Sequence, residues 1–255
     1  MRHDHALDRL ASCGARDLDG ITESPVAPAD EGYASGVLVD VGDIPGGGKL
    51  QLVRHGEDYE ILLGDEQLMG SWASCSEAAL ATLVSVRLGA RAERVLIGGL
   101  GLGFTLAAAR SAFAASTEII VAELVPSIVA WARGPLAHIF GCSLTDPRVA
   151  IKVRDVHELI VSEHASLDAI LLDVDNGPNG IVTLANERLY CNWGLRAARD
   201  ALRPGGILAI WSADPEEGFA DRLRAACFKV EEVMVDPDGT GRDPPHVIWL
   251  ATRAA

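Results

Sequence analysis

A short apolar run that breaks into alternating glycines constrains this chain more than any other segment. Val95 to Ile97 is typical of a strand buried on both faces, and a helix-like stretch begins soon after it, at Phe104. The glycines between the two are Gly98, Gly99, Gly101 and Gly103. Glycine permits positive φ and a close approach to the backbone, and the first N–H groups of a helix favour polar or anionic ligand atoms. The segment predicts a ligand-binding turn, although glycines at a strand end can also serve the turn alone.

Composition narrows the functional classes. The chain has 255 residues, enough for one α/β domain with a small addition, and its net charge of −14 argues against a nucleic-acid surface. That charge is compatible with a cationic substrate, although solubility alone also explains it. The cysteines are scattered, without a C-x-x-C pair or a nearby His at ligand spacing, so we expect no metal site and reduced thiols in a cytoplasmic protein. No run approaches the roughly 18 apolar residues of a membrane span, so we expect no membrane partner.

The first part of the chain divides into a tail and a small sheet. Residues 1–35 mix charged, Pro, Ser and Gly residues without periodicity, which predicts a flexible tail. Residues 36–70 form the next unit, in which short strands are expected at 37–41, 49–53 and 59–63. We expect these strands to form a small antiparallel sheet.

Residues 71–255 are expected to form a Rossmann-like nucleotide-binding domain. It opens with a helix at 71–88, after which strands and helices alternate, as in a parallel sheet covered on both faces. The expected strands are 94–98, 118–123, 148–153, 167–172 and 206–211, and the expected helices include 104–114, 125–138, 186–202 and 215–226. Two final strands, 229–235 and 246–252, have no helix between them and should pair antiparallel. This is an α/β class, the outline of the methyltransferase-like fold that S-adenosylmethionine enzymes use.

Acidic side chains follow three of the expected strands, where ligands of open parallel sheets bind. Glu123 ends the second strand and can accept the ribose hydroxyls of an adenosine, or else bond the start of the next helix. Asp155, beside Val156, follows the third strand and can accept an adenine amino group, or else cap a helix. Asp173 and Asp175 follow the fourth strand, where an Asx turn is the alternative role.

These residues resemble the spermidine synthase family of polyamine aminopropyltransferases, over about 36–252. The matching stretches are Gly98-Gly-Leu-Gly-Leu-Gly103, Glu123, Asp155, Asp173-Val-Asp-Asn-Gly-Pro178, Leu63-Gly-Asp-Glu-Gln-Leu68 and Ser76-Glu77. The resemblance implies that Asp173 is a base, and that Glu77 and Asp175 hold substrate ammonium groups. It also implies a small cationic amine substrate, decarboxylated S-adenosylmethionine or S-adenosylmethionine as co-substrate, and a homodimer built partly through 36–63. Trp211 ends the fifth strand, where it can contact the ligand.

One departure from the family pattern concerns the donor. Gly101 stands where the family has an aspartate facing the aminopropyl end of decarboxylated S-adenosylmethionine, so a charge that favours the decarboxylated form is missing. The fourth-strand motif is also one residue shorter than the family's, which weakens the match of Asp175. The glycines fit S-adenosylmethionine methyltransferases too, although Ile97 stands where those have an acidic residue. Three functions therefore stay open: aminopropyl transfer, methyl transfer, and nucleoside binding without catalysis.

Overall fold

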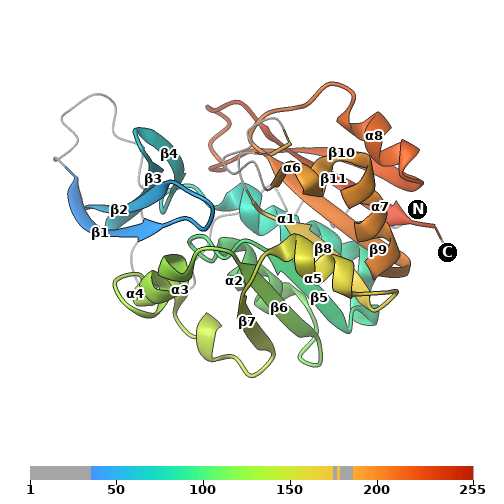
Figure 1. Ribbon diagram of the computed structural model, residues 1–255, viewed down its shortest axis with the longest axis horizontal. Coiled ribbons are helices and arrows are strands. Elements are labelled where there is room, and N and C mark those ends of the chain that lie inside the picture. The colour runs from blue at the N-terminus through green and yellow to red at the C-terminus, as the bar shows by residue number, and fades with distance from the viewer. Residues whose placement is uncertain (1–35, 175–176, 179–185, 255) are drawn as a thin grey trace.

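The computed structural model describes residues 36–174, 177–178 and 186–254. The tail expected at 1–35 and Asp175 therefore lie outside the described residues. Two sheets organise the rest of the chain, a small one at the N-terminal side and a larger one that carries the helices (Figure 1). Among the described residues, no helix is long and apolar enough to cross a membrane.

The small N-terminal sheet is antiparallel and has four strands in chain order. Its strands are β1 (Val37–Asp43), β2 (Lys49–His55), β3 (Asp58–Leu63) and β4 (Glu66–Gly70). Glycines at positive φ form the tight turns, including Gly56 between β2 and β3 and Gly64 between β3 and β4. Three strands were expected from the sequence. The fourth is missed because β4 is short and its alternation is interrupted by a register shift opposite Ile61 and Leu62.

The large sheet has seven strands in the order β10-β11-β9-β8-β5-β6-β7. Its strands are β5 (Arg94–Gly98), β6 (Glu118–Glu123), β7 (Val149–Val153), β8 (Leu167–Leu172), β9 (Leu202–Ser212), β10 (Phe228–Val235) and β11 (His246–Arg253). The first five are parallel, and β11 pairs antiparallel with both β9 and β10. The predicted α/β fold with a C-terminal antiparallel hairpin is confirmed. β9 begins earlier than expected because a register shift opposite Leu167 and Ala169 accommodates Pro204 and the glycines after it.

Helices cover both faces of the large sheet (Figure 1). They are α1 (Cys75–Leu88), η1 (Gly89–Arg91), α2 (Phe104–Ala112), α3 (Pro126–Arg133), α4 (Ala137–Phe140), η2 (Ser143–Thr145), α5 (Val156–Ser162), α6 (Glu187–Tyr190), α7 (Asn192–Ala201) and α8 (Phe219–Ala225). The helix expected at 125–138 is broken at Gly134, and the one expected at 186–202 is broken at Cys191, whose backbone is extended. The helix expected from residue 71 begins at Cys75, and the Ser74 side chain makes no capping hydrogen bond.

Two hydrophobic clusters lie on opposite faces of the large sheet. One includes Leu96 and Ile170 and is covered by α5, α7 and α8. The other includes Ile97 and Leu171, is covered by α1, α2 and α3, and continues into the N-terminal sheet through Leu52. The two sheets therefore share one core. A hydrogen bond from Trp131 Nε1 in α3 to Asp40 Oδ2 in β1, at 2.7 Å, also joins them.

Candidate functional site

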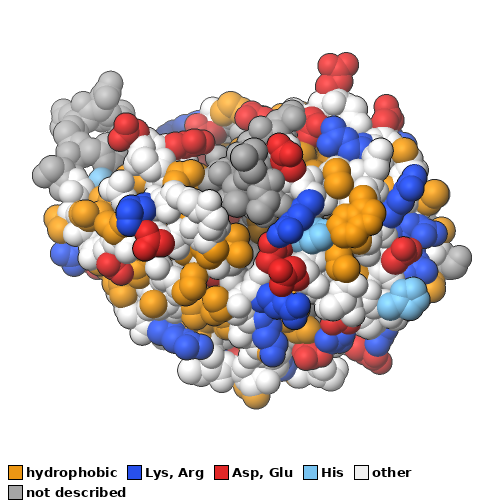
Figure 2. Space-filling model, viewed as in Figure 1, with side chains coloured by type: hydrophobic (Ala, Val, Ile, Leu, Met, Phe, Trp, Pro, Cys, Tyr) orange, Lys and Arg blue, Asp and Glu red, His pale blue; other side chains and the backbone are white. Residues whose placement is uncertain are grey.

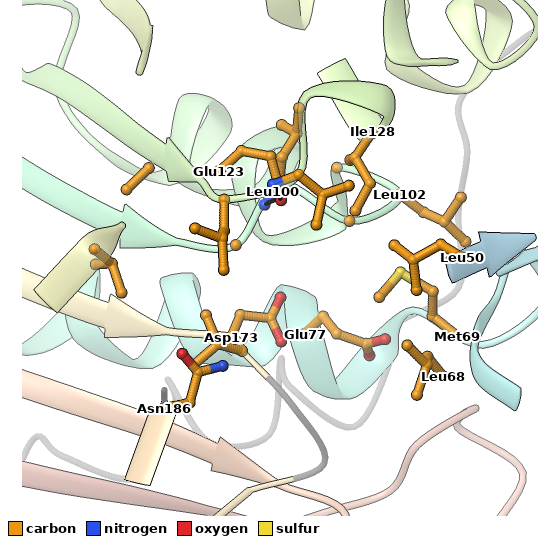
Figure 3. Close-up of a pocket in the computed structure, with 18 of the residues that line it drawn as sticks. Leu50, Leu68, Met69, Glu77, Leu100, Leu102, Glu123, Ile128, Asp173 and Asn186 are labelled. Carbon is orange, nitrogen blue, oxygen red and sulfur yellow. Dashed lines mark hydrogen bonds between the residues drawn. The ribbon is translucent and has the colours of Figure 1, made fainter. Parts of the chain in front are cut away.

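A pocket of about 1100 Å³, part of it open to solvent, lies at the carboxyl ends of the parallel strands and reaches the N-terminal sheet. Among the residues that the structure describes, its acidic side chains are Glu77, Glu123, Asp155 and Asp173. Figure 3 shows Glu123 and Leu100 on one side, Asp173 and Asn186 on another, and Leu50, Leu68 and Met69 at the end beside the N-terminal sheet. The switch point of an open α/β sheet therefore forms the site, as expected from the sequence.

Each position of the glycine turn requires a glycine for a different reason. A Cβ at Gly99, whose φ is +90°, would lie 2.2 Å from the carbonyl oxygen of Asp173, and one at Gly103 would lie 2.4 Å from the Phe140 ring. Gly98 does not line the pocket; its missing Cβ leaves room for Val156 and Leu172. Gly99, Gly101 and Gly103 line the pocket as well as forming the turn, and their role in binding a ligand stays a prediction.

Glu123 lines the pocket but is only 4% exposed. Its Oε2 accepts a hydrogen bond from the backbone N–H of Leu100 and its Oε1 one from the N–H of Val125, both at 2.8 Å. Burial raises the pKa of this carboxyl group despite those bonds. Glu123 therefore holds the glycine turn against the start of α3, which is the structural alternative given above. The backbone N–H groups of Gly101 and Leu124 also act on this carboxylate, so its oxygens face the glycine turn and the start of α3.

Asp155 caps α5, the alternative that the sequence left open. Its Oδ1 accepts from the backbone N–H of His157 at 2.8 Å, and its Oδ2 forms an ion pair with Arg188. Asp155 and Val156 both line the pocket, so the cap also faces the ligand space. The sequence analysis missed Arg188. It predicted one helix over 186–202, and a single long helix does not show that the Arg188 side chain reaches Asp155.

Asp173 and Glu77 form an electrostatically linked pair. Thr105 Oγ1 donates to Asp173 Oδ2 at 2.6 Å, and Ser76 Oγ donates to Glu77 Oε2 at 2.7 Å. Burial raises the pKa of Asp173 to about 6. Burial, followed by the charge of Asp173, raises the pKa of Glu77 to about 7. Two carboxyl groups whose pKa values are raised toward neutral pH are suited to accept a proton from a substrate.

His246 and Trp211 extend this pair toward the last strands. His246 Nδ1 lies 2.9 Å from Ser76 Oγ, and because Ser76 donates to Glu77, His246 is the donor in that contact. Trp211 lines the pocket, as expected, and its ring stands nearly perpendicular to His246 at 4.9 Å. Its buried Nε1 has no hydrogen-bond partner among the described residues. His246 was missed, although the antiparallel direction of β11 puts the start of that strand at this edge of the sheet.

The end of the pocket beside the N-terminal sheet is apolar. Its lining there consists of Ile44, Leu50, Leu68, Met69, Leu102 and Ile128. Figure 3 shows the Glu77 carboxylate between Asp173 and this apolar group. Sequence reasoning missed these residues because an apolar side chain in a strand ordinarily packs in a core.

No protein-family model and no curated protein matches the chain. Among solved structures, spermidine synthase from Thermotoga maritima is 18% identical with a TM-score of 0.69, covering 85% of this chain and 73% of that one. A spermidine synthase in complex with the transition state analogue AdoDATO is 17% identical with a TM-score of 0.67, covering 85% and 72%.

The chain has the spermidine synthase fold. The chain is also similar to a methyltransferase, the 1,6-didemethyltoxoflavin-N1-methyltransferase of Burkholderia thailandensis, whose structure contains S-adenosylhomocysteine. That protein is 20% identical with a TM-score of 0.51, and the match covers 71% of this chain and 80% of that one. The resemblance stated from the sequence is thus confirmed at the level of the fold, and these neighbours are transferases. Among the described residues, no group of His, Cys, Asp or Glu side chains is arranged to hold a metal ion.

Proposed function

We propose that the protein is a transferase that takes an aminopropyl group from decarboxylated S-adenosylmethionine and transfers it to an amine. The observation that carries the proposal is the Asp173 and Glu77 pair, which lies in the pocket beside the glycine turn with pKa values near 6 and 7. The residues fit a nucleoside donor. Glu123 lines the pocket at the glycine turn, and Gly101 lines it without a Cβ.

The reaction requires an unprotonated nitrogen. An alkylamine has a pKa of about 10.4, so it arrives as an ammonium, which has no lone pair and must lose a proton before the nitrogen can attack. In the proposed step the amine nitrogen forms a bond to the carbon next to sulfur, and the carbon–sulfur bond breaks with its electron pair going to sulfur. The sulfonium becomes a neutral thioether, and Asp173 takes the proton. Thr105 is a positioning residue, because its hydroxyl donates a hydrogen bond to the Asp173 carboxylate and so orients it.

Methyl transfer on the same fold is the second candidate, favoured by Gly101. No side chain projects from residue 101, and the atom nearest to its missing Cβ is Met69 Sδ at 3.0 Å, which carries no charge to hold a donor ammonium. S-adenosylmethionine would then be the donor. Its transferred methyl group needs no such partner.

The nucleoside product separates the three open functions. Purified protein would be incubated with each donor and a mixture of primary amines, and the released nucleoside identified by chromatography and mass spectrometry. Release of 5′-methylthioadenosine supports aminopropyl transfer, and release of S-adenosylhomocysteine supports methyl transfer. Tight donor binding with neither product would indicate a nucleoside-binding protein without catalysis and would overturn the proposal.

A further inference from the structure

The pocket wall beyond Asp173 includes two consecutive residues of strand β4. Strand β4 pairs Met69 with Ile61 and Gln67 with Leu62, so Leu68 is left without a cross-strand partner. Such a bulge re-aims side chains that would otherwise alternate between the two faces of a sheet. Leu68 and Met69 consequently both line the pocket.

All but one of the described acidic side chains in the pocket already have partners on both oxygens or a role in the proposed reaction. Both oxygens of Glu123 accept backbone N–H groups, and Asp155 is divided between a helix cap and Arg188. Asp173 is the base of the proposed reaction. Within residues 36–174, 177–178 and 186–254, Glu77 is therefore the remaining acidic side chain of the pocket that can hold an ammonium group.

Beyond Glu77, the space continues against hydrocarbon. Leu50, Leu68 and Met69 come from the N-terminal sheet, and Leu102 and Ile128 close the same end from the large domain (Figure 3). A second ammonium placed there would lose its hydration without gaining a carboxylate. A methyl or methylene group in the same place would be removed from water favourably.

We propose that the acceptor is a monoamine whose reacting nitrogen lies at Asp173 and Glu77 and whose apolar remainder packs against the wall formed by β2 and β4. This inference rests on the proposed function and specifies its substrate class. The specificity residue is Leu68, which meets the part of the acceptor farthest from the reacting nitrogen, whereas Met69 lies beside Gly101. A diamine fits the chemistry of the base but not this wall.

A matched pair of amines tests the proposal directly. n-Pentylamine and 1,4-diaminobutane have the same chain length, and the second ammonium of the diamine is replaced by a methyl group in the monoamine. Each would be titrated calorimetrically into protein saturated with 5′-methylthioadenosine. We expect n-pentylamine to bind about tenfold more tightly or better.

Two variants on the same strand locate the preference. Leu68→Glu puts a carboxylate into the apolar end and should weaken n-pentylamine while strengthening 1,4-diaminobutane, so that the tenfold preference disappears or reverses. The matched control is Gln67→Glu, which adds the same charge at an exposed position one residue away and should keep the wild-type preference. Leu68→Gln is a milder substitution that keeps the test available if the glutamate variant does not fold.

The outcomes distinguish the two proposals. Failure of 5′-methylthioadenosine to bind would overturn the proposed function. Normal nucleoside binding with 1,4-diaminobutane bound as tightly as n-pentylamine, or more tightly, would overturn the monoamine proposal and leave the proposed function standing. Normal nucleoside binding with neither amine bound would also overturn the monoamine proposal.

Discussion

The two sheets of this molecule are buried in different ways and supply different parts of the pocket. The large sheet is covered on both faces, and its parallel strands end in Glu123 and Asp173. The N-terminal sheet packs one face on the shared core and leaves most of β1 exposed; to the pocket it gives only apolar side chains, such as Leu50 and Met69. The comparison teaches that a parallel sheet brings acidic groups together at its strand ends, whereas the added sheet contributes an apolar wall to the same pocket.

Asp173→Asn should have the largest effect, because it tests whether a residue at a strand end of the large sheet is the base of the proposed reaction. An amide keeps an oxygen to accept the Thr105 hydrogen bond but cannot take a proton from the amine. We expect the turnover rate to fall by about a thousandfold while nucleoside affinity stays within about threefold of wild type. Steady-state kinetics and calorimetry would measure the two quantities. Turnover close to that of wild type would remove Asp173 as the base.

Glycines with positive φ in the two sheets should respond differently to alanine. Gly99→Ala puts a Cβ 2.2 Å from the Asp173 carbonyl oxygen, whereas a Cβ at Gly46, where φ is +96°, meets nothing within 4 Å. Gly46→Ala should lower the free energy of unfolding by about 1 kcal/mol, from backbone strain alone. Gly99→Ala should lower it by about 3 kcal/mol or more, because backbone atoms must also move. Chemical denaturation would measure both, and equal losses would contradict the difference.

The sequence predicts the large sheet better than the small one, for a physical reason. Largely apolar segments such as 118–123 and 167–172 are fixed by burial on both faces, and both strands form with those bounds. β4 has only one face against the core and a bulge at Leu68, so its pattern is weak. Helix breaks such as Cys191 depend on packing between neighbouring helices, which local propensity does not report.

The site was predictable wherever a polar residue follows a strand. Glu123, Asp155 and Asp173 all line the pocket, because strand ends of a parallel sheet meet at one edge. The contacts that occupy these carboxylates were not predictable. Arg188 and His246 reach the site from distant segments, and their hydrogen bonds depend on how helices and strands pack.

The exposed residues of β1 offer another contrast, because they are mostly apolar, whereas those of β10, an edge strand of the large sheet, are mostly charged. Val37, Leu38, Val39 and Val41 are 39–56% exposed, and Figure 2 shows hydrophobic side chains exposed at this end of the molecule. We propose that a second copy of the chain covers them, as expected from the sequence. Val39→Lys should weaken dimerisation roughly a hundredfold by burying a charge. Val86→Lys, an exposed position in α1, is the matched control. Light scattering that shows a monomeric wild type at micromolar concentration would contradict the proposal.

Glu77, in the domain of the large sheet, and Asp40, in the N-terminal sheet, have pKa values shifted in opposite directions, raised by burial for Glu77 and lowered by the hydrogen bond from Trp131 for Asp40. Folding raises the pKa of Glu77 from 4.5 to about 7, so between those pH values the folded protein binds more protons than the unfolded one. Stability conferred by the protonated group is therefore lost as the pH rises through this window. The free energy of unfolding of Glu77→Gln should rise by about 2 kcal/mol relative to that of wild type between pH 4.5 and pH 8. Glu66→Gln, exposed in β4, is the control, and an equal gain there would refute the assignment.

The smallest expected effect concerns Gly101, where the two regions meet. Its φ is +48°, a conformation that aspartate tolerates better than most residues, and its missing Cβ lies 3.0 Å from the flexible end of Met69. Gly101→Asp therefore adds a carboxylate beside the sulfonium's side chain at modest steric cost. We expect wild type to bind S-adenosylmethionine and its decarboxylated form within about tenfold of each other, and Gly101→Asp to shift the ratio about tenfold toward the decarboxylated form. Gly101→Asn has the same shape without the charge and should leave the ratio unchanged. Competitive titration measures all three proteins, and a wild-type preference above about a hundredfold would show that another residue already supplies the missing charge.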